Sequence, residues 1–110
     1  MNIVFLDTKT VGHTPNIEKL HDLGNLSTYE TTKPSETLER ISNADIVITN
    51  KVIVNANIME ACPKLKLICV AATGTNNIDL EYAKSKNIFV PPFFQGLSSC
   101  IQIDPGAYPD

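Results

Sequence analysis

A small loop in the middle of the chain carries the residues best suited to bind an anion. Residues 72–74, Ala-Thr-Gly, follow an apolar run over residues 65–71 and precede a helix-like stretch that starts near residue 79. Backbone N–H groups in such a turn can donate to a carboxylate or a phosphate, and the start of the next helix adds positive potential. Gly74 permits the close backbone approach that this contact needs. Thr73 and Gly74 are therefore candidate ligand-binding residues.

Side chains that could transfer a proton or bind a metal are scarce. Of the two histidines, His13 and His21, the second lies off the apolar face formed by residues 17, 20 and 23, so we expect it to be solvated. The three cysteines have no C-x-x-C spacing, a pattern typical of reduced intracellular thiols. No nucleophile elbow, phosphate-binding loop or H-E-x-x-H pattern occurs. We assign no catalytic, cofactor-binding or metal-binding residue.

Strand and helix signals alternate along the chain. Apolar runs predict five strands, over residues 2–7, 26–30, 45–50, 65–71 and 87–90. Alternating strands and helices with short connections predict a parallel sheet covered by helices on both faces. Right-handed crossovers favour the flavodoxin-like strand order 2-1-3-4-5. The predicted fold class is therefore α/β, with a five-stranded flavodoxin-like sheet.

Capping residues mark where the helices begin. Thr14-Pro15 predicts a helix start, and Gly24 predicts its end. Further helices are expected to begin at Pro34, with Leu38 and Ile41 facing inward, at a cap formed by Asn55 or Asn57, and at Asp79.

Two separated segments resemble the N-terminal part of the D-isomer-specific 2-hydroxyacid dehydrogenases. They are residues 44–52, Ala-Asp-Ile-Val-Ile-Thr-Asn-Lys-Val, and residues 62–81, which begin with Cys-Pro-Lys-Leu-Lys-Leu-Ile and include Ala-Thr-Gly-Thr-Asn-Asn-Ile-Asp. The second segment is most similar to the glycerate dehydrogenase (hydroxypyruvate reductase) branch. The similarity runs from about residue 1 to residue 90.

The resemblance implies a flavodoxin-like substrate domain over residues 1–90, which in this family is split by an inserted Rossmann domain that binds NAD. It implies that the backbone of Ala72, Thr73 and Gly74 binds a substrate carboxylate, and that Asn50-Lys51 lines the same cleft. The ligand would be a small 2-oxo or 2-hydroxy acid, with hydroxypyruvate and D-glycerate as candidates. On position alone, without the resemblance, a solvated loop lysine is the better interpretation of Lys51. The side chains at positions 76, 77 and 79 also suit turn and capping roles.

The sequence departs from the family pattern after residue 90. Residues 91–110 hold four of the seven prolines and none of the nine Lys and Arg residues, which predicts an irregular tail. The five glycines are far apart, so the G-x-G-x-x-G turn of a dinucleotide site is absent. The catalytic arginine, glutamate and histidine of the family lie beyond the similar region. We therefore expect a truncated domain that binds no cofactor and is inactive alone, with NAD(H) used by the parent family.

Composition limits the other classes of function. A net charge of −3 with interspersed signs gives no reason to expect binding to nucleic acid or a membrane, and no signal-like segment is visible, so we expect a cytoplasmic protein. A phospho-accepting receiver domain would need an aspartate at the end of the third strand and an acidic pair after the first, where only Asp7 stands. The alternative to the dehydrogenase domain is a stand-alone, non-enzymatic module that binds a small carboxylate or dimerises. An exposed cleft face and edge strand favour a homodimer.

Overall fold

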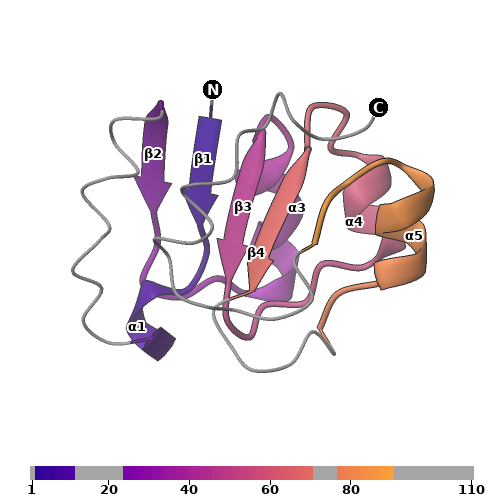
Figure 1. The fold of residues 1–110 in the computed structure, drawn as a ribbon. Helices are drawn as coiled ribbons and strands as arrows, with labels where there is room; N and C mark the ends of the chain where they lie inside the picture. Colours follow the sequence, from indigo (N-terminus) through magenta and orange to yellow (C-terminus); the bar gives the residue numbers. More distant parts are fainter. Residues whose placement is uncertain (1, 12–23, 71–76, 91–110) are drawn as a thin grey trace.

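The computed structural model describes residues 2–11, 24–70 and 77–90 of the chain. Within these ranges a four-stranded sheet forms the centre of the fold, in the order β2-β1-β3-β4 (Figure 1). Its strands are β1 (Asn2–Phe5), β2 (Asn25–Thr28), β3 (Ile46–Thr49) and β4 (Leu67–Val70). Every pair of neighbouring strands is parallel. The predicted α/β class is confirmed, and the order matches the first four positions of the predicted topology.

The fifth predicted strand, over residues 87–90, is reduced to a single bridge. Phe89 pairs with Leu67 in parallel, and two backbone hydrogen bonds of 2.9 and 3.0 Å flank this pair. Asn87 adopts a φ of 60°, so the chain turns sharply just before the bridge. Proline has no N–H group with which to extend a ladder, and residues 91 and 92 are both prolines. The chain thus occupies the position beside β4 without forming a strand of the sheet.

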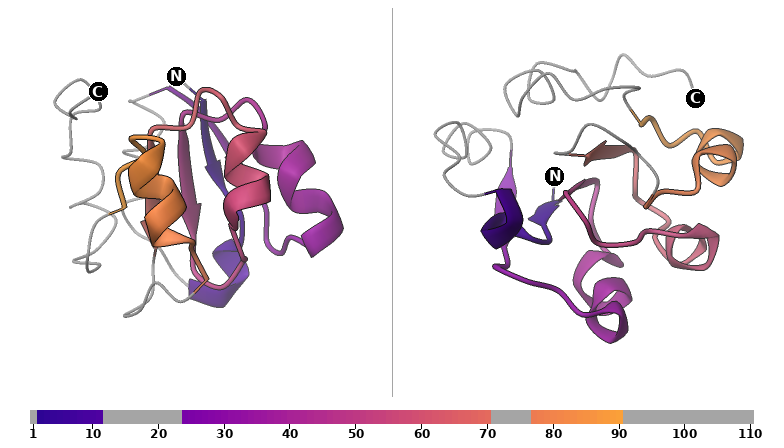
Figure 2. Two further views of the ribbon diagram at one scale, coloured as in Figure 1. Left: turned by 90° about the vertical axis from the view of Figure 1, so that its right-hand side faces the viewer. Right: turned by 90° about the horizontal axis from the view of Figure 1, so that it is seen from below.

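Three helices lie on one face of the sheet: α3 (Pro34–Ile41), α4 (Ala56–Glu60) and α5 (Leu80–Ser85) (Figure 2). A fourth, α1 (Thr8–Val11), is a single turn that follows β1 and was not predicted. The helix predicted to begin at residues 14 and 15 and the tail predicted over residues 91–110 lie outside the described residues. None of the described helices is long and apolar enough to cross a membrane.

Side-chain caps begin two of these helices as the sequence predicts. Asn55 Oδ1 accepts a hydrogen bond from the backbone N–H of Ile58 at 3.0 Å, so Asn55 rather than Asn57 caps α4. Asp79 Oδ1 accepts from the N–H of Tyr82 at 3.1 Å and caps α5. These bonds satisfy N–H groups that have no partner inside the helix.

The strands β1, β3 and β4 are buried on both faces of the sheet, whereas the edge strand β2 is mostly exposed. Alternate strand residues pack with the three helices in one apolar cluster that includes Val4, Val47, Ile68, Ile41, Met59 and Ala83. The residues between them on the strands are also buried, namely Ile3, Phe5, Ile46, Ile48, Leu67 and Cys69. Burial on both faces explains why β3 and β4 appear in the sequence as uninterrupted apolar runs.

One residue of α3 does not face the core as predicted. Leu38 is 42% exposed, whereas Thr37 and Ile41 are buried. Residues 37 and 41 are four apart and therefore share one helix face, and Leu38 is rotated about 100° from the first of them. The inward face is thus centred on Thr37, whose hydroxyl is satisfied by the carbonyl of Lys33 at 3.2 Å.

Candidate functional site

The carboxyl ends of the parallel strands meet at one edge of the sheet, where open α/β folds bind their ligands. The connection after β1 contains Asp7, and the loop after β3 contains Asn50 and Lys51. The chain after β4 continues into residues 71–76. The predicted binding residues Ala72, Thr73 and Gly74 therefore lie outside the described residues, and their role remains a prediction.

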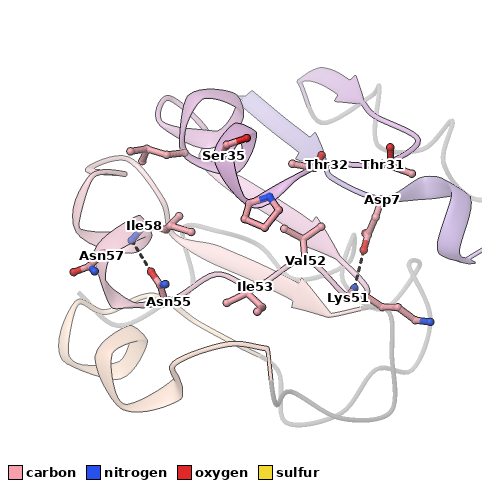
Figure 3. Close-up of a pocket in the computed structure, with 12 residues that line it drawn as sticks. Asp7, Thr31, Thr32, Ser35, Lys51, Val52, Ile53, Asn55, Asn57 and Ile58 are labelled. Atoms are coloured by element: carbon pink, nitrogen blue, oxygen red, sulfur yellow. Dashed lines mark hydrogen bonds between the residues drawn. The ribbon is translucent and has the colours of Figure 1, made fainter.

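The predicted binding residue Lys51 lies in the loop after β3 and is exposed. Its side chain extends away from the other labelled residues in Figure 3. Within the described part of the chain, its ammonium group forms no ion pair. Lys51 thus offers a solvated positive charge at the carboxyl edge of the sheet.

A buried carboxylate holds this loop in place. Asp7 is only 2% exposed. It accepts a hydrogen bond from the backbone N–H of Asn50 at 2.8 Å and another from the N–H of Lys51 at 2.7 Å. The first bond uses Oδ1 and the second uses Oδ2, so both carboxylate oxygens act on consecutive peptide groups (Figure 3 draws the second bond). Hydrogen bonds to an ionised acceptor are the stronger class, and this pair links the ends of β1 and β3.

The same loop is closed internally and tied to the segment that precedes α5. The Thr49 hydroxyl accepts from the N–H of Val52 at 3.0 Å and contacts the Val52 carbonyl at 3.3 Å. Asn77 Nδ2 also donates to the Val52 carbonyl, at 2.8 Å, and the N–H of Val54 donates to the Asn77 carbonyl at 2.9 Å. The side chain of Asn77 thus makes a long-range structural contact with Val52, rather than the local turn contact considered from the sequence. Its contacts bring the chain that follows residues 71–76 beside the loop of Lys51.

A pocket of about 700 Å³ opens next to this loop (Figure 3). It is lined by the β2–α3 connection, by the first turns of α3 and by the chain from residue 51 to residue 58 in α4; the residues are Asp7, Thr31, Thr32, Pro34, Ser35, Leu38, Lys51, Val52, Ile53, Asn55, Asn57 and Ile58. Its size is typical of small-molecule sites. Its hydroxyl-bearing wall, formed by Thr31, Thr32 and Ser35, could not be recognised from the sequence, because threonine and serine between a strand and a helix are ordinary turn residues.

Arg40 of α3 fixes the hydroxyl-bearing wall of this pocket. Its guanidinium donates to the carbonyl of Thr31 at 2.8 Å and to the hydroxyl of Thr32 at 2.7 Å. It also pairs with Glu36 at 3.1 Å and lies 4.0 Å from the centre of the Tyr29 ring. The charge of Arg40 is thus engaged in holding the β2–α3 connection. The exposed cation that borders the pocket is Lys51.

Groups that could transfer a proton or hold a metal ion are scarce among the described residues. The histidines lie outside the described residues. Cys62 follows α4 in the chain and its thiol is buried. Burial raises the pKa of this thiol to about 11, so at neutral pH it is protonated and inert. Among the residues that the structure describes, no cluster of three His, Cys, Asp or Glu side chains could hold a metal ion.

Comparison with known proteins relates this geometry to one family. Residues 3–92 match the family described as D-isomer specific 2-hydroxyacid dehydrogenase, catalytic domain. The chain is 38% identical over 89 residues to a glycerate dehydrogenase of Methylorubrum extorquens, covering 80% of this chain and 28% of the relative. It is 39% identical over 72 residues to a hydroxypyruvate reductase of Blautia hydrogenotrophica, covering 63% of this chain and 22% of the relative.

The fold agrees with that relationship. The cofactor (NAD+) bound 3-phosphoglycerate dehydrogenase of Entamoeba histolytica superposes with a TM-score of 0.68 at 30% identity, covering 82% of this chain and 32% of that one. The chain thus spans less than a third of the length of each of these relatives. The family match nonetheless covers most of the chain, including the strands and loops that build the carboxyl edge. This chain belongs to the D-isomer-specific 2-hydroxyacid dehydrogenase family, and residues 3–92 correspond to its catalytic domain.

Proposed function

We propose that this chain is the substrate-binding part of an NAD-dependent oxidoreductase that interconverts a 2-oxo acid and a D-2-hydroxy acid, with hydroxypyruvate and D-glycerate as the substrate pair. Two relatives support this choice by name, one a glycerate dehydrogenase and the other a hydroxypyruvate reductase. In this proposal the substrate carboxylate binds at the carboxyl edge, between the Lys51 side chain and the backbone of Ala72, Thr73 and Gly74.

The observation that carries the proposal is the fixed loop at the end of β3. The backbone N–H groups of Asn50, Lys51 and Val52 are engaged by Asp7 and Thr49. This loop therefore has the Lys51 ammonium to offer a carboxylate, rather than a row of free peptide groups. A lysine binds a carboxylate as a point charge, and the predicted backbone donors of residues 72–74 would supply the directional hydrogen bonds.

The nucleotide cofactor would have to be bound elsewhere than in the described part of the chain. A dinucleotide site needs a glycine-rich turn between a strand and the helix that receives the pyrophosphate. Here the connection from β1 to α1 is Leu6-Asp7, with no glycine, and the connections that lead from β2 to α3 and from β3 to α4 also contain none. In this proposal the described part of the chain binds the 2-oxo or 2-hydroxy acid, and the hydride donor NADH is bound outside it.

An NMR titration tests the proposal directly. Hydroxypyruvate, D-glycerate and glycerol would be added separately to the ¹⁵N-labelled 110-residue chain. We expect saturable shifts in the amide signals of residues 50–52 and 71–77 with the two acids. Glycerol, which lacks a carboxylate, should give none. Shifts confined to the opposite edge of the sheet, or no saturable shift with either acid, would contradict the proposal.

The pocket between α3 and α4 favours a second candidate function, that of a non-enzymatic module that dimerises or binds a partner. Leu38 and Ile53 border it and are 42% and 59% exposed, a feature also expected of a module that binds a partner. Sedimentation of the same chain without ligand distinguishes this non-enzymatic role. A stable dimer whose formation is lost in Ile53→Asp, together with no acid binding, would favour the dimerisation module.

A further inference from the structure

Asp7 is a carboxylate where an apolar side chain would be the ordinary choice. It follows the buried strand β1, and its own exposure is 2%. Acidic side chains are almost never buried to this extent unless charged or polar groups satisfy them. The two backbone N–H groups that donate to Asp7 come from residues 43 and 44 positions further along the chain. Asp7 therefore links the segment that follows β1 to a distant loop.

The geometry of these bonds fixes the direction of one side chain. The planar carboxylate receives the N–H of Asn50 on one oxygen and the N–H of Lys51 on the other, at 2.8 and 2.7 Å. Two consecutive peptide groups are thereby held, and the Thr49 hydroxyl holds the next N–H at 3.0 Å. The Cα–Cβ bond of Lys51 leaves from the middle of this held segment. A long side chain that starts from a fixed backbone loses less conformational entropy on binding a ligand than one on a mobile loop.

A second aspartate shows what a purely structural version of this contact looks like. Asp45 precedes β3 and accepts a hydrogen bond from the backbone N–H of Asn2 through Oδ2 at 2.7 Å. It thus links β1 and β3 at their amino ends, as Asp7 does at their carboxyl ends. Since ligands bind at the carboxyl ends in this class of fold, Asp45 should support the sheet without affecting binding.

We propose that Asp7 is a positioning residue: its buried carboxylate sets the backbone of Asn50 and Lys51 and thereby aims the Lys51 ammonium at the substrate carboxylate. This inference rests on the proposed function of Lys51. Asp7 itself does not touch the substrate in this account. Its effect on affinity passes through Lys51, so the two residues should not contribute independently.

A double-mutant cycle in the 110-residue chain tests the inference, with hydroxypyruvate as the probe and the dissociation constant as the readout. Asp7→Asn keeps the size of the side chain but can accept only one of the two hydrogen bonds. We expect it to weaken binding about tenfold, as Lys51→Gln should. The double variant should bind no more weakly than Lys51→Gln alone, because coupled residues are not additive. The matched control, Asp45→Asn, should change the dissociation constant less than about twofold.

Each other outcome has a distinct meaning. Additive losses in the double variant, or equal losses for Asp7→Asn and Asp45→Asn, would overturn the positioning role and leave Lys51 binding intact. Failure of the wild-type chain to bind hydroxypyruvate would overturn the proposed function, and the inference with it. If Asp7→Asn does not fold, Asp7→Glu takes its place in the cycle. This variant keeps two acceptor oxygens but displaces them by one methylene, and the same loss of additivity with Lys51→Gln is expected.

Discussion

Because of Cys62, we expect the free energy of unfolding of the chain to fall at alkaline pH. Its thiol is 3% exposed and donates to the carbonyl of Ile58 at 3.1 Å. Desolvation by burial raises its pKa from 9.0 to about 11. The unfolded chain therefore loses the thiol proton at a lower pH than the folded chain does. Because the unfolded state then binds fewer protons, the free energy of unfolding falls as pH rises from 9 to 11.

The two pKa values set the size of this effect. Relative to neutral pH, the loss is about 1.4 kcal/mol at pH 10, about 2.3 kcal/mol at pH 11 and at most about 2.7 kcal/mol. Below pH 9 the contribution of the protonated thiol is fully present. The variant Cys62→Ala has no thiol to ionise, but it loses a buried sulfur and a hydrogen bond, at a cost of about 1 kcal/mol at pH 7. The stabilities of the two proteins should therefore cross near pH 10.

Urea unfolding followed by circular dichroism, at half-unit steps from pH 7 to pH 11, measures this directly. The comparison uses the difference between wild type and Cys62→Ala, in which other titrating groups cancel. Cys62→Ser is the matched variant, because its hydroxyl can still donate to the Ile58 carbonyl but does not ionise in this range. Its stability relative to Cys62→Ala should stay constant with pH. Parallel stability curves for wild type and Cys62→Ala would show that burial does not raise the pKa of Cys62.

Two further pairs of variants test the helices around the pocket, by urea unfolding at pH 7. Asn55→Ala removes the cap of α4 and should lower the free energy of unfolding by about 1 kcal/mol. Asn57→Ala should change it by less than about 0.5 kcal/mol. Equal effects of the two variants would contradict the assignment of Asn55 as the cap. Ile41→Ala empties a fully buried site and should cost about 2 to 5 kcal/mol, whereas Leu38→Ala, at a position 42% exposed, should cost less than about 1 kcal/mol. A larger loss for Leu38→Ala would mean that Leu38 packs in the core.

Much of the fold could be predicted from the sequence because burial on both faces leaves a clear pattern. β3 and β4 are buried at every position, and each is a short, nearly continuous apolar run. The segment over residues 87–90 has the same apolar composition but forms only a bridge. Composition alone does not show that Asn87 would take a positive φ just before it. The number of strands therefore depended on local backbone geometry that an apolar run does not encode.

The place of Lys51 in the fold could be predicted from the sequence, whereas the binding roles of Lys51 and of residues 72–74 remain predictions. Lys51 lies at the carboxyl edge of the sheet, as expected, because parallel strands bring their loops to one edge. The contact of Asp7 with the loop of Lys51 was missed, although its place directly after the first apolar run was a usable signal. Its partners are 43 and 44 residues away, and a single sequence does not reveal which loop a buried carboxylate will reach. Leu38 was misplaced because the apolar face of a short helix can be centred on a buried threonine.

In the proposed function, Lys51 binds the carboxylate of a 2-oxo acid at the carboxyl edge of the sheet. Isothermal titration of hydroxypyruvate into the wild-type chain, Lys51→Gln and Lys66→Gln tests it most directly. Lys66 is the matched control, because it is also exposed but precedes β4 and so lies at the amino edge. We expect binding about tenfold weaker for Lys51→Gln and nearly unchanged for Lys66→Gln. Equal affinity of wild type and Lys51→Gln would contradict a binding role for Lys51.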